Sequence, residues 1–439
     1  MFLSIIPSSA IMFVALALFL TTYVFLLLLP KYRAYVALIA ALVFIVLGIS
    51  PVGDLLNQID FNVLMMIAGT MGIVALFIES KMPSLLADLI LKHVPNVKWA
   101  IIYLSLFAGV VSAFVDNVAT VIMIAPVAIN IAKKLKISPV LSIIAIAISS
   151  NIQGAATLVG DTTSIMLAGS LDMSFNDFFW YHGKPGLFFI VMAGAAVSLV
   201  VLYFYFKKDT QKVVWEEKTE VTDYFPTFLL GGMILLLISA SLLNIPAGFV
   251  KNHINGFIVM TLLFIGLIYK LIKTRNPKSL LETVKEIDYF TLLLLVGLFI
   301  IIGGLETAGV IEKISEIIVS VSKGNLFVTY TILVFASVLF SAFIDNIPYV
   351  LTMLPVIATL GTNFPGVEGT PYVLYFGLLV GATLGGNITP IGASANITGI
   401  GILRKEGYEV KASTFMKLSI PFTLAVVLCG YLLTWIIWA

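Results

Sequence analysis

Apolar stretches long enough to cross a bilayer recur from one end of the chain to the other, and no other feature of the sequence restricts its fold as strongly. Lipid offers the backbone no hydrogen-bond partners, so such a stretch is stable only as a helix or within a closed barrel. The runs are continuous and do not alternate with a period of two, which argues against a barrel. Because 60% of the residues are hydrophobic and 11% are charged, the sequence predicts an all-α polytopic membrane protein in contact with a lipid bilayer.

The rest of the composition excludes several kinds of site. The formal net charge is +2, and the basic residues lie mostly in short loops, so no basic stripe for nucleic acid is present. Cys429 is the only cysteine, which excludes an intrachain disulfide and a cysteine-built metal site. The first apolar run, at about 8–30, is long enough to span and predicts a retained helix. We expect no nucleic-acid partner, no resident cofactor and no enzymatic activity.

The apolar stretches and the basic residues between them predict a topology. Lysine and arginine favour the cytoplasmic ends of short loops, and this places both termini outside the cell, with the chain in the inner (plasma) membrane. The loops expected inside are those near 31–33, 81–98, 133–136, 207–212, 270–278 and 404–411. Full spans are expected at about 8–30, 33–50, 61–80, 139–171, 185–206, 226–244, 255–272, 288–308, 371–403 and 415–438.

With this topology the two halves of the chain run in opposite senses and contain the same parts in the same order. The first repeat is 1–206, a charged cytoplasmic linker is 207–225, and the second repeat is 226–439. Each has three spans, a paired apolar stretch, a span interrupted by polar residues and a closing span. Inverted repeats are typical of secondary transporters, which bind substrate near the bilayer midplane between the repeats. Amphipathic pieces at 82–93 and 310–323 are either interfacial helices or extensions of the preceding spans.

One short motif occurs twice, as SAFVDN at 112–117 and as SAFIDN at 341–346. Each copy lies at the midpoint of a paired apolar stretch, at about 98–135 and 325–362. Two foldings fit. The stretch could be two full spans joined by a surface turn, where Asp and Asn are ordinary turn and capping residues. It could also be a re-entrant hairpin whose tip stops inside the protein, which the absence of glycine or charge beside the first Asp-Asn pair favours.

Two polar stretches interrupt the predicted spans at about 139–171 and 371–403. They read SSNIQGAATLVGDTTSIM at 149–166 and GGNITPIGASANITG at 385–399. This much glycine, with Pro390, should break each helix at membrane depth and leave carbonyls and amides that only a protein-lined cavity accommodates. Packing of small residues between helices is the alternative. The two stretches align without gaps through Gly154/Gly386, Thr157/Thr389, Gly160/Gly392, Ser164/Asn396 and Ile165/Ile397.

Three aspartates, Asp116, Asp161 and Asp345, lie deep in predicted membrane. Each costs about 2.5–3.5 kcal/mol at the midplane, and the predicted spans place no lysine or arginine at similar depth. They must be neutralised by protons, by Na⁺ held by oxygen ligands, or by helix N-termini at the hairpin tips. A bare anion would meet a negative site, so an anionic substrate is expected to travel with Na⁺ or H⁺, or in its protonated form.

At these motifs the chain resembles the ion transporter superfamily, and within it the arsenite permease/NhaD-type group, which includes P-protein-like and citrate transporter-like sequences. The matching pieces are AFVDNVATVIMIAPVAI, NIQGAATLVGDTT, AFIDNIPYVLTMLPVIATL and GGNITPIGASAN. The resemblance covers nearly the whole chain and implies re-entrant hairpins, a homodimer and an elevator-like movement. This chain has Gly160-Asp161-Thr162-Thr163-Ser164 where P-protein-like sequences have GDPPN, so the resemblance implies an ion site there that either has different ligands or is absent. Aspartate in place of the serine that divalent-anion/sodium symporters carry at the hairpin tips argues against a di- or tricarboxylate site.

The sequence thus predicts a secondary active ion transporter in which Na⁺ and H⁺ compete for the aspartates, most simply as Na⁺/H⁺ exchange. The alternatives are a Na⁺- or H⁺-coupled permease for a small anion or oxyacid, such as arsenite, citrate or chloride, and a passive channel. An intramembrane aspartyl protease is disfavoured, because its GxGD signature needs glycine where Leu158 stands. The predicted site consists of Asp116, Asn117, Thr157, Asp161, Thr162, Ser164, Asp345, Asn346, Thr389, Ser394 and Asn396, with Asp116, Asn117, Asp345, Asn346 and Asn396 as Na⁺ ligands.

Overall fold

The computed structural model describes residues 8–213, 215, 218–243, 246, 248–363 and 370–439. Over these residues the chain forms twenty α-helices, three 3₁₀ turns and one short antiparallel ribbon. Eight of the described helices are long and apolar enough to cross a membrane, or nine spans if α15 and α16, bent by 115° at their junction, count as one. The prediction of an all-α polytopic membrane protein is confirmed.

The elements follow the same order in the two halves of the chain. The first half contains α1 (Ser8–Leu28), α2 (Arg33–Val46), α3 (Leu55–Gln58), α4 (Phe61–Glu79), α5 (Met82–Leu91), α6 (Val97–Ser112), α7 (Asn117–Leu135), α8 (Val140–Gly154), α9 (Thr162–Leu171), the ribbon β1 (Trp180–Tyr181) and β2 (Lys184–Pro185), and α10 (Leu187–Tyr205). The second half contains α11 (Phe225–Leu242), α12 (Phe249–Thr274), α13 (Pro277–Lys285), α14 (Tyr289–Thr307), α15 (Val310–Ser322), α16 (Leu326–Ser341), α17 (Asn346–Asn363), α18 (Tyr372–Gly385), α19 (Ser394–Lys405) and α20 (Ala412–Trp438). The 3₁₀ turns are Pro30–Tyr32, Val52–Asp54 and Asn176–Phe178.

Matched capping residues start the corresponding helices of the two halves. Asp60 accepts a hydrogen bond from the backbone of α4, and Asp288 does the same for α14. Asn96 and Asn325 cap α6 and α16 in the same way. A side-chain oxygen at this position satisfies one of the backbone N–H groups that the first turn of a helix leaves unpaired. The same local chemistry therefore fixes equivalent helix starts about 229 positions apart, the spacing of the two Asp-Asn motifs.

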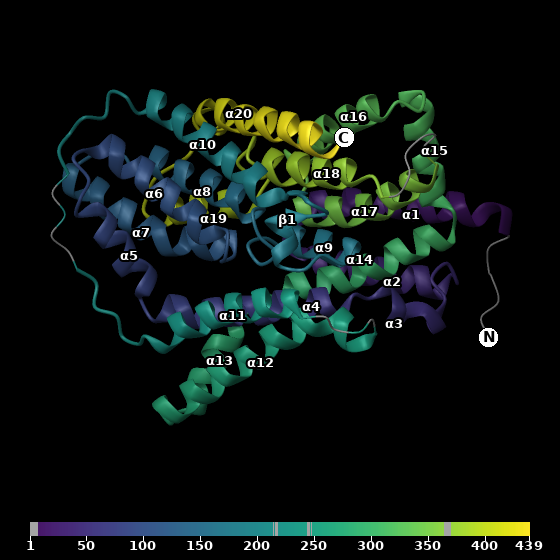
Figure 1. Cartoon of the computed structure of the whole chain (residues 1–439), viewed down its shortest axis with the longest axis horizontal. Coiled ribbons are helices and arrows are strands. Elements are labelled where there is room, and N and C mark those ends of the chain that lie inside the picture. Colours follow the sequence, from purple (N-terminus) through teal and green to yellow (C-terminus); the bar gives the residue numbers. More distant parts are fainter. Residues whose placement is uncertain (1–7, 214, 216–217, 244–245, 247, 364–369) are drawn as a thin grey trace.

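The helices form two layers (Figure 1). In one layer α4 packs against α12, and in the corresponding place α2 packs against α14, with α1 and α11 beside them. In the other layer α6 packs on α8, α16 on α18 and α10 on α20, and α19 lies against α7 and α8. We call these the scaffold layer and the core layer. Elements of the second half thus complete both layers.

The two Asp-Asn motifs lie at the turns of helical hairpins, α6–α7 and α16–α17. The first arm of each hairpin, α6 or α16, has 16 residues. At about 1.5 Å per residue such an arm is about 24 Å long, which is shorter than the hydrocarbon core of about 30 Å. This length favours the re-entrant folding over two full spans.

The amphipathic helices α5 and α15 are separate from the spans before them. Each begins directly after a residue in the left-handed conformation, Lys81 with φ 61° and Gly309 with φ 74°. A left-handed residue ends the preceding helix and redirects the chain. The two helices are therefore not extensions of α4 and α14.

Each polar-interrupted span is broken into two helices, α8 and α9 in the first half and α18 and α19 in the second. Residues 155–161 separate the first pair and 386–393 separate the second. The first break is buried throughout, as expected of a non-helical backbone that needs protein partners at membrane depth. Both breaks lie beside the hairpin turns, as the predicted site requires.

The charged linker between α10 and α11 is attached to both layers. Backbone N–H groups of Val97 and Lys98 donate to carbonyls of Gln211 and Asp209 at 2.9 and 2.8 Å. The buried carboxylate of Asp88 on α5 accepts hydrogen bonds from Trp215 Nε1 and from Thr219. The linker therefore crosses the end of the α6–α7 hairpin before it reaches the scaffold.

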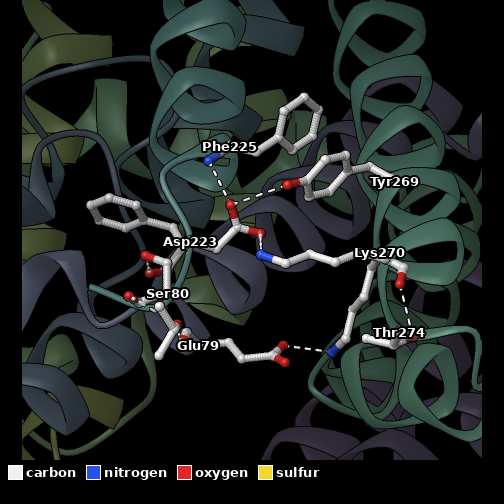
Figure 2. Close-up of polar contacts among 10 residues, drawn as sticks. Glu79, Ser80, Asp223, Phe225, Tyr269, Lys270 and Thr274 are labelled. Atoms are coloured by element: carbon white, nitrogen blue, oxygen red, sulfur yellow. Dashed lines mark hydrogen bonds and ion pairs between the residues drawn. The ribbon is translucent and has the colours of Figure 1, made fainter. Parts of the chain in front are cut away.

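The far end of the linker is fixed to α12, as Figure 2 shows. Asp223 pairs with Lys273 at 2.8 Å and accepts hydrogen bonds from Tyr269 and from the Phe225 N–H. Burial alone would raise the pKa of Asp223, but these bonds outweigh it and hold the pKa below its usual value. Next to it the buried Lys270 of α12 bonds Glu79 at the end of α4, at 2.5 Å.

The close packing of α2 on α14 generates a prediction at Gly297. A Cβ placed there would lie 2.7 Å from the carbonyl carbon of Ala37. We expect Gly297→Ala to lower the free energy of unfolding by about 1–3 kcal/mol, because the neighbouring backbone must move. Thermal unfolding of the purified protein measures this. Gly231→Ala in α11, where a Cβ meets nothing within 4 Å, is the matched control, and equal stability of the two variants would contradict the packing.

Candidate functional site

A cavity of about 280 Å³ lies between the two hairpin turns and the scaffold layer. We call it the central cavity. Five carboxylates and one guanidinium line it together with amide, hydroxyl and apolar groups. The charged lining residues are Asp116, Asp161, Asp345, Asp288, Glu286 and Arg33. The predicted residues Asn117, Thr162, Asn346 and Ser394 also line it.

The first half-site, defined by Asp116, Asn117, Asp161 and Thr162, is built from the α6–α7 turn and the start of α9. Asp116 caps α7 through Oδ1, which accepts from the N–H groups of Val118 and Ala119 at 3.0 and 3.1 Å. Asp161 is 7% exposed, and its Oδ2 accepts a hydrogen bond from the Thr163 hydroxyl at 2.8 Å. This half-site thus presents two carboxylates to the cavity, with no basic side chain bonded to either among the described residues.

The amide of Asn117 is fixed by polar groups of the core layer. Its Oδ1 accepts from the Ser112 hydroxyl at 2.6 Å, and its Nδ2 donates to Asn151 at 3.2 Å. The hydroxyl of Ser150 donates to the Asn117 carbonyl at 3.1 Å. These bonds hold the hairpin turn against α8, next to the helix break.

The second half-site consists of Asp345, Asn346, Ala393 and Ser394, which occupy the positions equivalent to the four residues of the first. Asp345 Oδ1 accepts from the Ile347 N–H at 3.1 Å, matching the Asp116 cap. The Ser394 hydroxyl approaches Asp345 Oδ2 at 3.4 Å. Alanine stands at 393 where the first half has Asp161, so this half-site has one carboxylate fewer.

Asp345 has a basic partner, which corrects the prediction that no arginine or lysine lies near the three aspartates. Arg33, the first residue of α2, donates from Nη1 to Asp345 Oδ2 at 2.5 Å. The expectation was wrong because Arg33 is in a predicted loop, and its side chain extends from the start of α2 into the central cavity. Long basic side chains commonly reach across apolar surface in this way.

Backbone carbonyls converge at the same place in both halves. A Cβ at Gly160 would lie 2.4, 2.6 and 2.7 Å from the carbonyl oxygens of Gly154, Ser112 and Ala113. At the equivalent Gly392 the distances to the oxygens of Gly386, Ser341 and Ala342 are 2.5, 2.7 and 2.8 Å. Only glycine fits there. Each cluster joins the carbonyl end of a hairpin arm to a helix break, where carbonyls lack their intrahelical partners.

Four predicted residues lie inside the protein and not on the cavity wall. Thr157 and Thr389 donate from their hydroxyls to the carbonyls of Ala113 and Ala342, which belong to the two clusters. Ser164 and Asn396, at equivalent positions, are fully buried. The Ser164 hydroxyl and Asn396 Oδ1 have no hydrogen-bond partner among the described residues. The sequence therefore identified positions that surround the carbonyl clusters as well as ones that line the cavity.

The two broken spans are hydrogen-bonded directly to each other near their breaks. Asn151 Nδ2 donates to the Thr383 carbonyl at 2.9 Å, and Asn387 Nδ2 donates to the Ile148 carbonyl at 2.9 Å. The Thr163 and Thr383 hydroxyls lie 2.9 Å apart. Asn151, Thr163 and Asn387 lie in the two polar stretches, but partners more than 200 positions apart give no local signal, so the sequence assigns these residues no role.

Glu286 and Asp288 are also missing from the predicted site, although both line the central cavity. They precede α14, in a stretch that the topology treats as the end of a loop. Asp288 caps α14 through Oδ1, which accepts from the Thr291 N–H at 3.0 Å. The cap could be predicted from Asp288 and the apolar run after it, but its position in the cavity could not.

A second cavity, of about 490 Å³, lies at the opposite end of the scaffold helices, and Asp54, Asp60 and Glu306 are among its lining residues. Burial raises the pKa of Asp60. Helix α4 starts at this cavity with Asp60 and reaches the central cavity at Ile78. Helix α14 starts at the central cavity with Asp288 and reaches the second cavity at Glu306. Equivalent helices thus run in opposite directions between the cavities, which supports the predicted inversion.

Among the described residues, no group of three or more His, Cys, Asp or Glu side chains is placed to hold a metal ion. The oxygen groups present are carboxylates, hydroxyls, amides and backbone carbonyls, which suit hard cations and not a transition metal. The arrangement can therefore attract and neutralise a small cation at a helix break.

Comparison with known proteins gives both a family and a fold. A family model described as a citrate transporter, CitMHS, matches residues 16–381. An uncharacterized transporter of Mycobacterium tuberculosis is 30% identical over 413 residues, which are 92% of this chain and 93% of that protein. The P protein of Mus musculus is 27% identical over 472 residues, covering 90% of this chain and 56% of that protein.

Two solved transporter structures have a similar fold. The YdaH transporter of Alcanivorax borkumensis has a TM-score of 0.59 at 13% identity, covering 88% of this chain and 86% of that chain. MtrF of Neisseria gonorrhoeae, which belongs to a class of antimetabolite efflux pumps, has a TM-score of 0.55 at 16% identity. The match covers 90% of this chain and 83% of that chain. At such identities the likeness shows the fold alone.

The carbonyl cluster at Gly160 generates a prediction. We expect Gly160→Ala to lower transport by about tenfold or more, because a methyl group there pushes apart the hairpin turn and the helix break. Transport by the reconstituted variant measures the effect, after size-exclusion chromatography has shown a folded protein. Gly401→Ala in α19, where a Cβ meets nothing within 4 Å, is the control. Normal transport by Gly160→Ala would show that this close approach is not needed.

Proposed function

The chain belongs to the CitMHS citrate transporter family of the ion transporter superfamily, and from this premise we propose that it is a Na⁺-coupled secondary transporter that exchanges Na⁺ for H⁺. The observation that carries the proposal is the central cavity, where five carboxylates face one guanidinium. Membership of the family by itself gives the class, secondary transport across a membrane. The identity of the coupling ion is inferred from the charged residues that line the cavity.

The lining of the cavity favours a cation over an anion. A unit charge about 4 Å from another interacts by about 4 kcal/mol at an effective dielectric constant of 20. Asp116 and Asp161 lie together on one wall with no bonded basic side chain, so a positive charge between them is attracted by both. Either a proton on one carboxylate or a Na⁺ shared with nearby carbonyl oxygens reduces their repulsion. Competition between the two ions for one place is the basis of exchange.

The position of the cavity supports an alternating mechanism. The cavity is lined by Arg33 and Glu286, which the predicted topology places at the cytoplasmic side, so this conformation is the inward-facing one. The core layer carries both hairpins and both helix breaks, and its internal hydrogen bonds let it move as a body against the scaffold. We propose an elevator-type movement of the core layer in a homodimer in the plasma membrane, with both chain termini outside.

A second candidate is transport of a small carboxylate or oxyacid together with cations. Two observations favour it: the family description names citrate, and Arg33 supplies a cavity guanidinium of the kind that binds carboxylates. The five carboxylates of the wall oppose entry of a bare anion. Such a substrate would therefore enter with Na⁺ or H⁺, or protonated, through the same coupling site.

The test is Na⁺-driven proton movement in proteoliposomes that contain a pH-sensitive dye. We expect wild-type protein to acidify or alkalinise the lumen according to the direction of the Na⁺ gradient. Asp116→Asn and Asp161→Asn should each reduce this flux by about tenfold or more, because each removes one of the two charges that attract the cation. Glu316→Gln, which alters an exposed pair with Lys313 on α15, is the control for a charge change elsewhere.

Two outcomes would redirect the proposal. Full Na⁺-dependent flux in both aspartate variants would contradict a cation site at the first half-site. A wild-type protein that moves no protons under a Na⁺ gradient, but accumulates arsenite, citrate or chloride when a cation gradient is applied, would favour the second candidate. Flux that only follows the ion's own gradient would indicate a channel.

A further inference from the structure

The two half-sites have equivalent backbones but unequal charges. Both have an aspartate that caps the second hairpin arm, and both lie beside a cluster of three carbonyl oxygens around a glycine. The first adds a second carboxylate, Asp161. The second has Ala393 in that position and instead bonds Arg33. Two unpaired negative charges on one side thus correspond to a neutral ion pair on the other.

The position of Arg33 makes this difference a fixed property of the protein. Its guanidinium remains protonated at any physiological pH. Only its Nη1 bonds Asp345, and its side chain lines the central cavity 25% exposed. Among the described residues it is the single basic residue on the cavity wall. A second anchor holds the same hairpin near α1 and α2, since the Tyr23 hydroxyl donates to the Pro348 carbonyl at 2.7 Å.

A permanent positive charge at Asp345 opposes a mobile cation beside that carboxylate. At a separation of about 4 Å and an effective dielectric constant of 20, repulsion weakens the binding of a second cation on the order of a thousandfold. The carboxylate that would compensate is already paired. The first half-site meets no such repulsion and has one more carboxylate.

We propose that Arg33 is the resident cation of the second half-site, so that each protomer binds one mobile Na⁺, at the first half-site only. This inference rests on the proposed Na⁺ coupling and specifies its stoichiometry and location. A duplicated site would hold two mobile cations if its charges were duplicated too. Here the protein supplies one of the two positive charges, and only the other comes from solution.

The experiment is equilibrium binding of ²²Na⁺ to the purified full-length protein in nanodiscs. Wild-type protein should bind one Na⁺ per protomer. Asp161→Ala, which copies the alanine of the second half-site, should reduce Na⁺ affinity by at least about tenfold. Arg33→Gln should add a second Na⁺ per protomer, and Arg33→Lys, which keeps the charge, should retain one.

Further variants keep the inference testable if Arg33→Gln does not fold. Asp345→Asn should still bind one Na⁺, because Asp345 is paired with Arg33 and is not a ligand of the mobile ion. The double variant Arg33→Gln/Asp345→Asn removes the pair without leaving a charge and should also bind one. Glu316→Gln should match wild type throughout.

Each result distinguishes this inference from the function it depends on. Wild-type protein that binds no saturable Na⁺ would overturn the proposed Na⁺ coupling itself. Two Na⁺ per protomer in wild type, or a stoichiometry of one in folded Arg33→Gln, would overturn the role of Arg33 and leave the coupling intact. Loss of Na⁺ binding in Asp345→Asn would place the ion at the second half-site instead. If Arg33→Gln keeps one Na⁺ but loses the stabilisation that citrate gives to wild-type protein, Arg33 binds the anionic substrate and is not a resident cation.

Discussion

Neutralisation of carboxylates that lie away from water is the constraint on which the rest of this structure depends. Charged groups at membrane depth persist only where they face a cavity, a partner or a helix terminus. Here Asp116 and Asp345 receive backbone N–H groups at the starts of α7 and α17. Each of those helix starts follows a hairpin turn, and each turn is hydrogen-bonded to the broken span beside it. The irregular backbone, costly in lipid, is thus what makes the buried charges possible.

The duplicated architecture provides two half-sites, and these have similar backbones but different charges. The carbonyl clusters at Gly160 and Gly392 agree closely in geometry, because backbone packing tolerates no side chain there. The charges around them are set by single side chains, Asp161 in the first half-site and Arg33 beside the second. The second half-site has Ala393 where the first has Asp161, and Arg33 of α2 pairs with its aspartate. The two half-sites therefore differ in net charge although their hydrogen-bonded backbones are alike.

Much of this arrangement could be predicted from the sequence, because its signals are local. Continuous apolar runs give the membrane class, the repeated Asp-Asn motifs mark the hairpin turns, and glycine-rich stretches mark the breaks. The choice between a hairpin and two spans needed the helix bounds, since the 16 residues of α6 and of α16 are few for a full span and favour turns that stop short. The pairing of Arg33 with Asp345 could not be predicted, because a basic residue at this position indicates a cytoplasmic loop and gives no sign that its side chain extends into the cavity. Glu286 and Asp288 were missed because their local sequence predicts the start of a helix but not that this start faces the central cavity.

The linker adds a mechanical consequence to the electrostatic one. It bonds α5 and the start of α6 at one end, through Asp88 and the backbone near Val97, and α12 at the other, through Asp223. The proposed movement of the core layer against the scaffold would therefore have to stretch, release or carry this segment. The buried carboxylate of Asp88 accepts three hydrogen bonds from the linker, and release would leave it without them, at a cost of about 1–3 kcal/mol or more. The linker is thus expected to move with the hairpin and to bend near Asp223, where its contacts are closer to water.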